Sequence, residues 1–295
     1  MGRINDASRL AHGEPTSSLI ARNQRAFTAP WNIGDHERTA GESPGETVVG
    51  TAVRSVPQVG PSSLLDESQP SNFGGFNPEW THRLVISPHA NVELVEQFRS
   101  LAASLHRLQV NGVPKVLMVT SADPGEGKTL SSLNLALTLS ESYRQRVLLI
   151  DADLRRPSIR EVSQLGHAPG LSEGLKASAD KKLSVIPLTA SLTLLPAGAP
   201  DPNPMSSLTS PRMRRIIDEA ARRFDWVVLD APPLGPIADA SLLASMVDGA
   251  LFVVRAGRTA FSAVERAVDA LGRDRILGVI LNGVEEGESA PYGRY

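Results

Sequence analysis

The residues from Ser121 to Thr129 read SADPGEGKT and lie between an apolar run, VLMVT, and a stretch of helical pattern, LSSLNLALTLS. Gly125 and Gly127 let backbone N–H groups approach phosphate oxygens closely, and the helix that follows directs its positive end toward them. The usual pattern has another glycine five residues before Gly127, where this chain has Ala122. Because alanine is also small, we interpret the stretch as a phosphate-binding loop between a strand and a helix.

The polar side chains of this loop indicate a nucleotide as its ligand. The Lys128 ammonium can reach the β- and γ-phosphates, and the Thr129 hydroxyl can ligate Mg²⁺. We predict that the loop binds the nucleotide through Asp123, Pro124, Gly125, Glu126, Gly127, Lys128, Thr129 and Leu130.

Two more strands are predicted to end in carboxylates. The segment LLIDADLRRP places Asp151 and Asp153 two residues apart, so both point off the same side of the strand's carboxyl end. There they could hold Mg²⁺ through water, or one could accept a proton from an incoming hydroxyl. The segment WVVLDAPP places Asp230 where phosphate-loop NTPases commonly have a second contact to Mg²⁺. The alternative interpretation of these acids is that they are solvated loop residues.

A fourth strand end carries Asn282, within ILNG. Its amide could both donate to and accept from an adenine edge. Asn-Gly is also a common turn signal, so a purely structural interpretation stays open.

Composition restricts the class of protein. The 295 residues carry a net charge of −2, which gives no electrostatic argument for nucleic acid or an anionic membrane as a partner. Without cysteine, the chain has no disulfide, no cysteine-ligated zinc and no thiol catalysis. No run approaches the roughly 18 apolar residues of a membrane span, and the first residues lack the apolar core of a signal peptide. We expect a cytoplasmic protein.

Residues 1–83 differ from the rest in composition. They are rich in Gly, Pro and Ser without a sustained apolar period, so they cannot bury enough surface to offset their ordering entropy. We predict a disordered extension and favour a solvated linker for it, with Val48-Val49 and Leu64-Leu65 as short docking points in the alternative interpretation.

Beyond this extension, apolar runs alternate with helical patterns. The runs are KVLMVT, RVLLID, WVVLDA, ALFVVR and ILGVIL, typical of strands buried on both faces. Helical patterns span 90–109, 128–142, 205–223, 237–247 and 259–272. The alternation predicts an α/β fold, a doubly wound and mostly parallel sheet of the P-loop NTPase type, over residues 84–285. Residues 286–295 are predicted to form a flexible tail.

With these motifs in order, the chain resembles the bacterial tyrosine kinases of capsular and exopolysaccharide synthesis. The resemblance spans about 90 to 285 and includes TSADPGEGKT, VLLIDADLRRP, PGLSEGL, LTLLPAGAPDPNPMSSLTSPRM and FDWVVLDAPPLGPIADASLLASMVDGALFVVRAGRT. The related partition and septum-site ATPases carry a lysine at the position of Asp123, so its absence disfavours that subfamily.

The resemblance implies an ATP- and Mg²⁺-dependent enzyme that transfers the γ-phosphoryl group to tyrosine hydroxyls. It implies that Lys128 and Thr129 hold the phosphates and Mg²⁺, that Asp151 is the general base and a metal contact, that Asp153 and Asp230 position the metal through water, and that Asn282 meets the adenine. It also implies a peripheral location at the inner membrane, a membrane-bound polysaccharide co-polymerase or chain-length regulator as activating partner, and a homo-oligomer.

Two features depart from the family pattern. Family members end in a run of tyrosines, whereas the end of this chain, ESAPYGRY, offers only Tyr292 and Tyr295 as phosphate acceptors. The family's oligomerisation helix carries Glu-x-x-Arg-x-x-Arg, of which Glu96 and Arg99 are present and the third position is Ala102. An alternative is therefore an ATP-dependent interaction protein of the same machinery with little or no kinase activity. A partition-type positioning ATPase is disfavoured by Asp123.

Overall fold

The described residues form an α/β fold whose central sheet has helices on both faces and which also contains a separate two-stranded sheet. The computed structural model describes residues 63–68, 73–109, 112–166, 168–177, 181–235 and 239–284. Within these ranges the central sheet has the order β5-β6-β3-β7-β2-β8-β9. Its strands are β2 (Val116–Ser121), β3 (Val147–Asp151), β5 (Ile186–Pro187), β6 (Leu192–Leu195), β7 (Trp226–Asp230), β8 (Gly249–Arg255) and β9 (Ile276–Asn282). All neighbours are parallel except β5 and β6, so the predicted doubly wound fold is confirmed.

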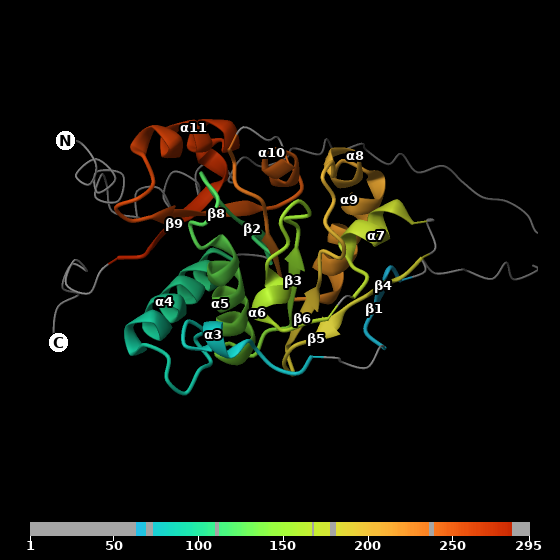
Figure 1. Cartoon of the computed structure of the whole chain (residues 1–295), viewed down its shortest axis with the longest axis horizontal. Helices are drawn as coiled ribbons and strands as arrows, with labels where there is room; N and C mark the ends of the chain where they lie inside the picture. The colour runs from blue at the N-terminus through green and yellow to red at the C-terminus, as the bar shows by residue number, and fades with distance from the viewer. Residues whose placement is uncertain are drawn as a thin grey trace, which may run out of the picture. The chain divides into compact units, whose positions relative to one another are not determined.

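Successive residues of each central strand point to opposite faces and enter two separate cores. Leu117 and Val119 of β2 pack with α4 (Val92–Leu108), α5 (Lys128–Glu141) and α6 (Ile159–Val162). Val116 and Met118 pack in the core on the other face, which includes residues of α7 (Leu171–Lys176), α8 (Met205–Leu208), α9 (Pro211–Arg223), α10 (Asp239–Ala244) and α11 (Phe261–Leu271). Figure 1 shows α4 and α5 below the sheet and α10 and α11 above it.

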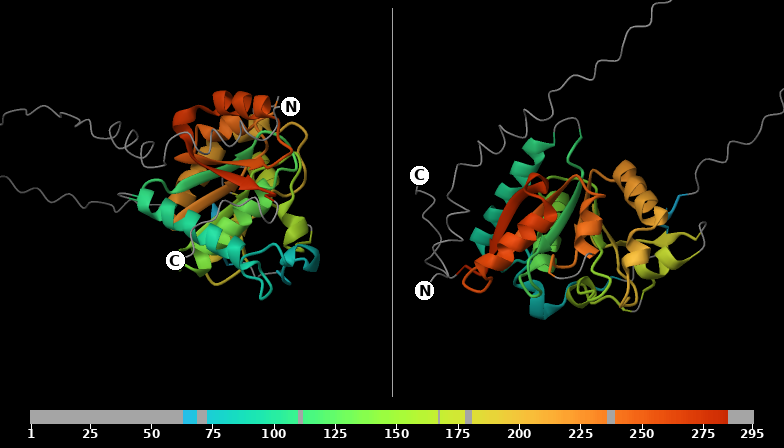
Figure 2. Two further views of the ribbon diagram at one scale, coloured as in Figure 1. Left: turned by 90° about the vertical axis from the view of Figure 1, so that its left-hand side faces the viewer. Right: turned by 90° about the horizontal axis from the view of Figure 1, so that it is seen from above.

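Helix α5 is buried along nearly all of its length. Its sequence is apolar or small on every side, which is the pattern of a helix enclosed by protein. It lies between α4 and strands β2, β3 and β7, as the views of Figure 2 also show. The phosphate-binding loop before it is therefore attached to the most enclosed helix of the domain.

The register of the sheet brings two predicted site residues together. Asp151 at the end of β3 is paired with Asp230 at the end of β7, and Val119 of β2 is paired with Asp230 as well. Because the strands are parallel, their carboxyl ends meet at one edge, where ligands of such sheets bind.

Two predicted elements differ in the structure. The helix expected over 205–223 is two helices, because the Ser210 side chain accepts a hydrogen bond from Met213 N and Pro211 begins α9. Strand β9 was expected to be buried on both faces, but it lies at the sheet edge and leaves Val279 61% and Leu281 51% exposed. The apolar run could not distinguish an edge strand from a central one.

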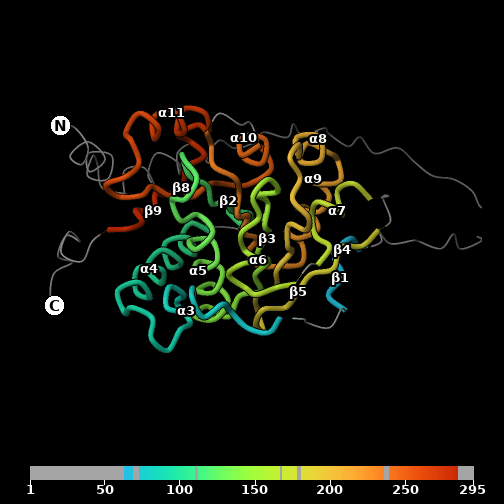
Figure 3. The backbone as a smooth tube through the Cα atoms, in the orientation of Figure 1, coloured from blue at the N-terminus to red at the C-terminus, as the bar shows by residue number. Residues whose placement is uncertain are grey.

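Described structure begins before residue 84, the predicted start of the folded domain. Strand β1 (Leu65–Asp66) pairs in parallel with β4 (Leu183–Ser184), and helix α3 (Pro78–Thr81) precedes Leu84. Leu64 and Leu65 are buried in the core, as expected of docking points. In Figure 3 strand β1, drawn in blue, lies beside β4. Val48-Val49 lies outside the described residues. Within the described ranges, no helix is long and apolar enough to span a membrane.

Candidate active site at the carboxyl ends of β2, β3 and β7

The phosphate-binding loop joins β2 to α5, and Lys128 is the first residue of that helix. Gly127 caps the helix with a φ of 98°, a left-handed conformation that glycine adopts without strain. Lys128 is only 8% exposed, and its Nζ lies 2.8 Å from Asp153 Oδ2. Burial opposes its charge, but Asp230, Asp153 and Asp151 outweigh that effect and raise the pKa of Lys128. The lysine is therefore held protonated among carboxylates.

Three buried aspartates surround this lysine. Burial, followed by repulsion from Asp230 and Asp153, raises the pKa of Asp151 well above its ordinary value. Burial also raises the pKa of Asp230, with Lys128 and the nearby Thr129 hydroxyl acting in the opposite direction. Three carboxyl groups thus face one ammonium, and repulsion among them adds to the effect of burial on the pKa of Asp151.

Several carboxylate oxygens of the site lack partners. Within the described ranges, neither Oδ1 of Asp151 nor either oxygen of Asp230 accepts a hydrogen bond of normal geometry. Asp151 Oδ2 accepts one long hydrogen bond, 3.3 Å from Ile159 N. Buried polar atoms without partners are uncommon in folded proteins, and they mark places where a ligand or ion completes the site.

The predicted metal ligand Thr129 points to a neighbour that the sequence did not single out. Its Oγ1 lies 2.7 Å from the Ser158 hydroxyl, in the loop that follows β3. Among the described residues, no group of three acidic or histidine side chains is arranged to ligate one ion directly. Water-mediated contacts, which Mg²⁺ commonly keeps, are the arrangement expected for Asp153 and Asp230.

The comparisons with known proteins agree on one family. Residues 117–292 match the model of the CobQ/CobB/MinD/ParA nucleotide binding domain. The chain is 34% identical over 203 residues to the tyrosine-protein kinase YwqD of Bacillus subtilis, covering 68% of this chain and 85% of that protein. It is 32% identical to the kinase domain of the Escherichia coli tyrosine kinase ETK, with a TM-score of 0.61 over 68% of this chain and 80% of that structure.

The chain belongs to the bacterial tyrosine kinase family. A third relative is the succinoglycan biosynthesis transport protein ExoP of Rhizobium meliloti, which is 34% identical over 206 residues. That match covers 68% of this chain but only 26% of ExoP. The resemblance read from the motifs is thus confirmed for the family, its P-loop fold and its nucleotide-binding domain.

Within this family fold, four residues support the phosphate-binding loop from outside it, and only Asn282 had been singled out. Asn282 Nδ2 donates to Glu126 O at 2.8 Å and lies against Gly127, where an added Cβ would be 2.0 Å from that nitrogen. Arg255, Thr259 and Ser158 are the others. The RAGRT segment was noted only for its resemblance, and its polar residues directly after a strand end were the signal that could have found Arg255 and Thr259.

The loop residues predicted to bind the nucleotide do not behave alike. Asp123, Pro124 and Gly125 are exposed, whereas Glu126 is 3% exposed. The Glu126 carboxylate is occupied by Asp123 N and by the Thr259 hydroxyl. The Glu126 side chain therefore has a role within the protein, whereas the exposed residues Asp123, Pro124 and Gly125 are accessible to a ligand.

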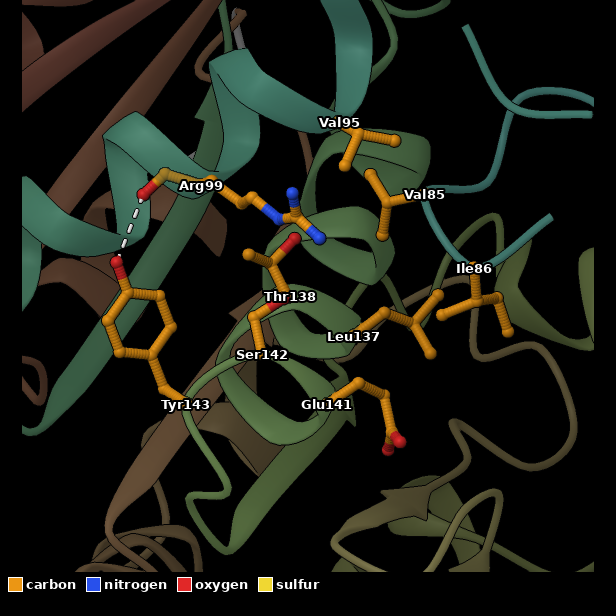
Figure 4. Close-up of a pocket in the computed structure, with 9 residues that line it drawn as sticks. All are labelled: Val85, Ile86, Val95, Arg99, Leu137, Thr138, Glu141, Ser142 and Tyr143. Carbon is orange, nitrogen blue, oxygen red and sulfur yellow. Dashed lines mark hydrogen bonds between the residues drawn. The ribbon is translucent and has the colours of Figure 1, made fainter. Parts of the chain in front are cut away.

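The predicted oligomer contacts lie on α4, away from this site, and Arg99 faces the end of α5 that is opposite the phosphate-binding loop. Glu96 and Arg99 on α4 form an exposed ion pair of 2.7 Å, and Ala102 is fully buried in the core. Arg99 also lines a hollow of about 510 Å³ beside the last turn of α5, where Tyr143 donates to the Arg99 carbonyl (Figure 4). The predicted acceptors Tyr292 and Tyr295 lie outside the described residues.

Proposed function

We propose that this chain is an ATP- and Mg²⁺-dependent protein-tyrosine kinase whose reaction takes place at the carboxyl ends of β2, β3 and β7. The observation that carries the proposal is the cluster of Asp151, Asp153 and Asp230 around Lys128 at the start of α5. Membership of the tyrosine kinase family gives the reaction class, and the phosphate-binding loop gives the phosphoryl donor.

Lys128 is the residue best suited to bind the transferred phosphate. The raised pKa keeps its ammonium charged, and it begins the enclosed helix α5, whose positive end faces the same region. When ATP binds, the ammonium would exchange part of its contact with Asp153 for phosphate oxygens. Preorganised positive charge of this kind supplies much of the catalysis of phosphoryl transfer.

Asp151 is the proposed proton acceptor for the tyrosine hydroxyl. It ends β3 beside Lys128, and one of its oxygens has no partner among the described residues. A carboxylate held in this way can accept the phenol proton as the oxygen attacks in line.

The donor set fits Mg²⁺. The oxygens of Asp151 and Asp230 without partners and the Thr129 hydroxyl are hard ligands of the kind that Mg²⁺ prefers. Thr129, Asp151, Asp153 and Asp230 would hold the ion, the last two through water. Bound Mg²⁺ would neutralise charge on the β- and γ-phosphates.

The proposal extends to the setting of the enzyme. Phosphate would be accepted by Tyr292 and Tyr295 of another copy, in a homo-oligomer to which Glu96 and Arg99 contribute. The polysaccharide setting follows from relatives such as ExoP, whose name places it in succinoglycan biosynthesis and transport. We infer a membrane-bound polysaccharide co-polymerase as activating partner, which would hold the chain at the membrane periphery.

The test is phosphate transfer by purified protein. We expect tandem mass spectrometry to find phosphate on Tyr292 or Tyr295 after incubation with ATP and Mg²⁺, with and without the cytoplasmic segment of a candidate partner. Lys128→Met should lower the rate roughly 100- to 1000-fold, the effect of removing one preorganised charge contact. Lys182→Met, at an exposed lysine, is the matched control. Full phosphorylation of the Lys128→Met protein would refute the proposal.

A second candidate is an ATP-dependent interaction protein with little kinase activity. It is favoured by Ala102, which is fully buried where the family has its third charged contact, so the oligomer contact is reduced to Glu96 and Arg99. Nucleotide binding without phosphotyrosine, partner included, would favour this candidate. So would normal polysaccharide production by Tyr292→Phe, Tyr295→Phe protein when Lys128→Met protein fails.

A further inference from the structure

The phosphate-binding loop contains a buried carboxylate, which is unexpected beside a site for anions. Glu126 is 3% exposed, and both of its oxygens are used within the protein. Oε2 accepts a hydrogen bond from Asp123 N at 3.0 Å, which closes the loop on itself. Oε1 accepts the hydroxyl of Thr259, which lies beyond the end of β8. The side chain is thus occupied before any ligand arrives.

Thr259 connects this carboxylate to the backbone of the sheet. Its hydroxyl accepts a hydrogen bond from Arg255 N at 3.0 Å and donates its proton to Glu126, so its single donor is used by the carboxylate. Thr259 N also donates to Arg255 O at 3.0 Å, which closes the turn after β8. The Arg255 guanidinium donates to Gly125 O at 3.1 Å. Two separate contacts therefore tie the loop to one end of β8.

The loop has a physical need for such support. Gly125 and Gly127 have φ values of 79° and 98°, and glycine loses more backbone freedom on ordering than any other residue. If the loop becomes ordered only when the ligand binds, the loss of entropy weakens the affinity. A preformed loop avoids this loss on binding.

We propose that Glu126, Thr259 and Arg255 form a brace that holds the phosphate-binding loop in its nucleotide-accepting conformation before nucleotide binds. They are positioning residues, and they act through the backbone of residues 123–127. The inference rests on the proposed function for the identity of the ligand, a nucleoside di- or triphosphate with Mg²⁺. The brace itself is defined by contacts among residues of this chain.

The brace and simple charge repulsion predict opposite results at Glu126. If the carboxylate acted only through its negative charge, Glu126→Gln would remove repulsion and tighten the binding of anionic phosphates. If the carboxylate holds the loop, Glu126→Gln loses one of its accepted hydrogen bonds and binding weakens.

Thr259→Val is the cleanest variant, because it keeps the shape of the side chain and the charge of the site. The chain offers a matched control in Thr189→Val. The Thr189 hydroxyl likewise accepts from a backbone amide, Leu192 N, and donates to a glutamate, Glu141 Oε1 at 2.5 Å. That pair lies at the other end of α5, so it tests the same chemistry away from the loop.

The first measurement is calorimetric titration with Mg-ADP, which does not depend on kinase activity. We expect Thr259→Val to raise the Kd roughly 5- to 10-fold, the effect of one lost hydrogen bond. Thr259→Ser, which keeps the hydroxyl, and Thr189→Val should stay within about twofold of the original protein. In kinase assays Thr259→Val should raise KM for ATP by more than it lowers kcat, because it removes binding made equally in the ground and transition states.

The second measurement is amide hydrogen exchange in nucleotide-free protein. Residues 123–127 should exchange faster in Thr259→Val, with no change at the far end of α5. Unchanged exchange and Kd in Thr259→Val, or tighter binding in Glu126→Gln, would overturn the brace. Failure of the original protein to bind Mg-ADP, with faster loop exchange in Thr259→Val, would instead overturn the proposed function and leave the brace standing as a structural contact.

Discussion

Two sets of buried carboxylates among the described residues, one at the ends of β3 and β7 and one on α9, have opposite environments. At the ends of β3 and β7, burial raises the pKa values of Asp151 and Asp230, and three of their four oxygens accept no hydrogen bond from the described residues. On α9, the Glu219 carboxylate accepts hydrogen bonds from Ser63, Leu64 and Leu65 of the N-terminal segment. Burial opposes its ionisation, but these bonds and Arg223 lower the pKa of Glu219.

The difference separates a structural carboxylate from carboxylates kept for a ligand. Glu219 holds β1 against the domain, and every strong contact it can make is already made by the protein. Asp151 and Asp230 keep lone pairs that no described residue uses, at a cost in stability that folded proteins accept at functional sites.

The largest expected effect is on catalysis and comes from changing a carboxylate of the proposed active site. Asp151→Asn should lower phosphate transfer roughly 1000-fold, because it removes the proposed proton acceptor. The same change should stabilise the nucleotide-free protein by roughly 1–2 kcal/mol, because it relieves repulsion among buried carboxylates. Radioactive phosphate transfer and thermal unfolding without nucleotide measure the two effects.

A drop in the unfolding temperature of Asp151→Asn would contradict the assignment of Asp151 to a strained functional cluster. Asp225→Asn is a suitable control, because the Asp225 carboxylate accepts a hydrogen bond from Arg146 N on the exposed side of the fold.

The next largest effect is on stability and comes from changing the structural carboxylate Glu219. Glu219→Gln should destabilise the domain by roughly 1–3 kcal/mol, because an amide cannot accept all the hydrogen bonds that the carboxylate accepts. Nucleotide affinity should stay within about twofold, because the site lies on other elements. Urea unfolding followed by circular dichroism measures the stability, and proteolysis near residue 63 reports release of β1. Equal stability would show that the N-terminal segment is not held by Glu219.

A third effect concerns pH and follows from the lowered pKa of Glu219. The carboxylate stabilises the fold fully above its unfolded pKa of about 4.3, and this contribution is lost as the pH falls through the lower folded value. The stability difference between the original protein and Glu219→Gln should therefore be constant above about pH 5.5 and shrink below about pH 4. Unfolding midpoints in urea at several pH values test this, and a difference that grows toward low pH would reverse the assigned direction.

The smallest effect belongs to an exposed carboxylate. Glu96 pairs with Arg99 across one turn of α4, and their side chains are 61% and 52% exposed. Glu96→Gln should change the stability of the isolated chain by no more than about 0.5 kcal/mol. If the pair contributes to a homo-oligomer, sedimentation velocity should show dissociation without a change in the unfolding temperature. A large loss of stability would mean that the pair has a role within the chain.

The sequence predicted the central strands, the main helices and the loop at 121–129, because continuous apolar runs and glycine-rich phosphate loops are local patterns. It missed the short strands β1, β4, β5 and β6, which are too short to carry a period. It gave no sign of the structure before residue 84, where the backbone of Leu64 is held by Glu219, 155 residues further along the chain. The residues outside the described ranges, Tyr292 and Tyr295 among them, remain predictions.

The sequence by itself determined the fold class, the family and the acids that end β3 and β7, since each follows from residue types at short spacing. Only the tertiary structure decided which of these groups lack partners, that Lys128 pairs with Asp153, and that Glu126 is used by Thr259 rather than by a ligand. These properties depend on contacts between residues that lie 25 to 133 positions apart. Hydrogen bonding and burial depend on which residues are neighbours in space, and a local sequence pattern does not predict those neighbours.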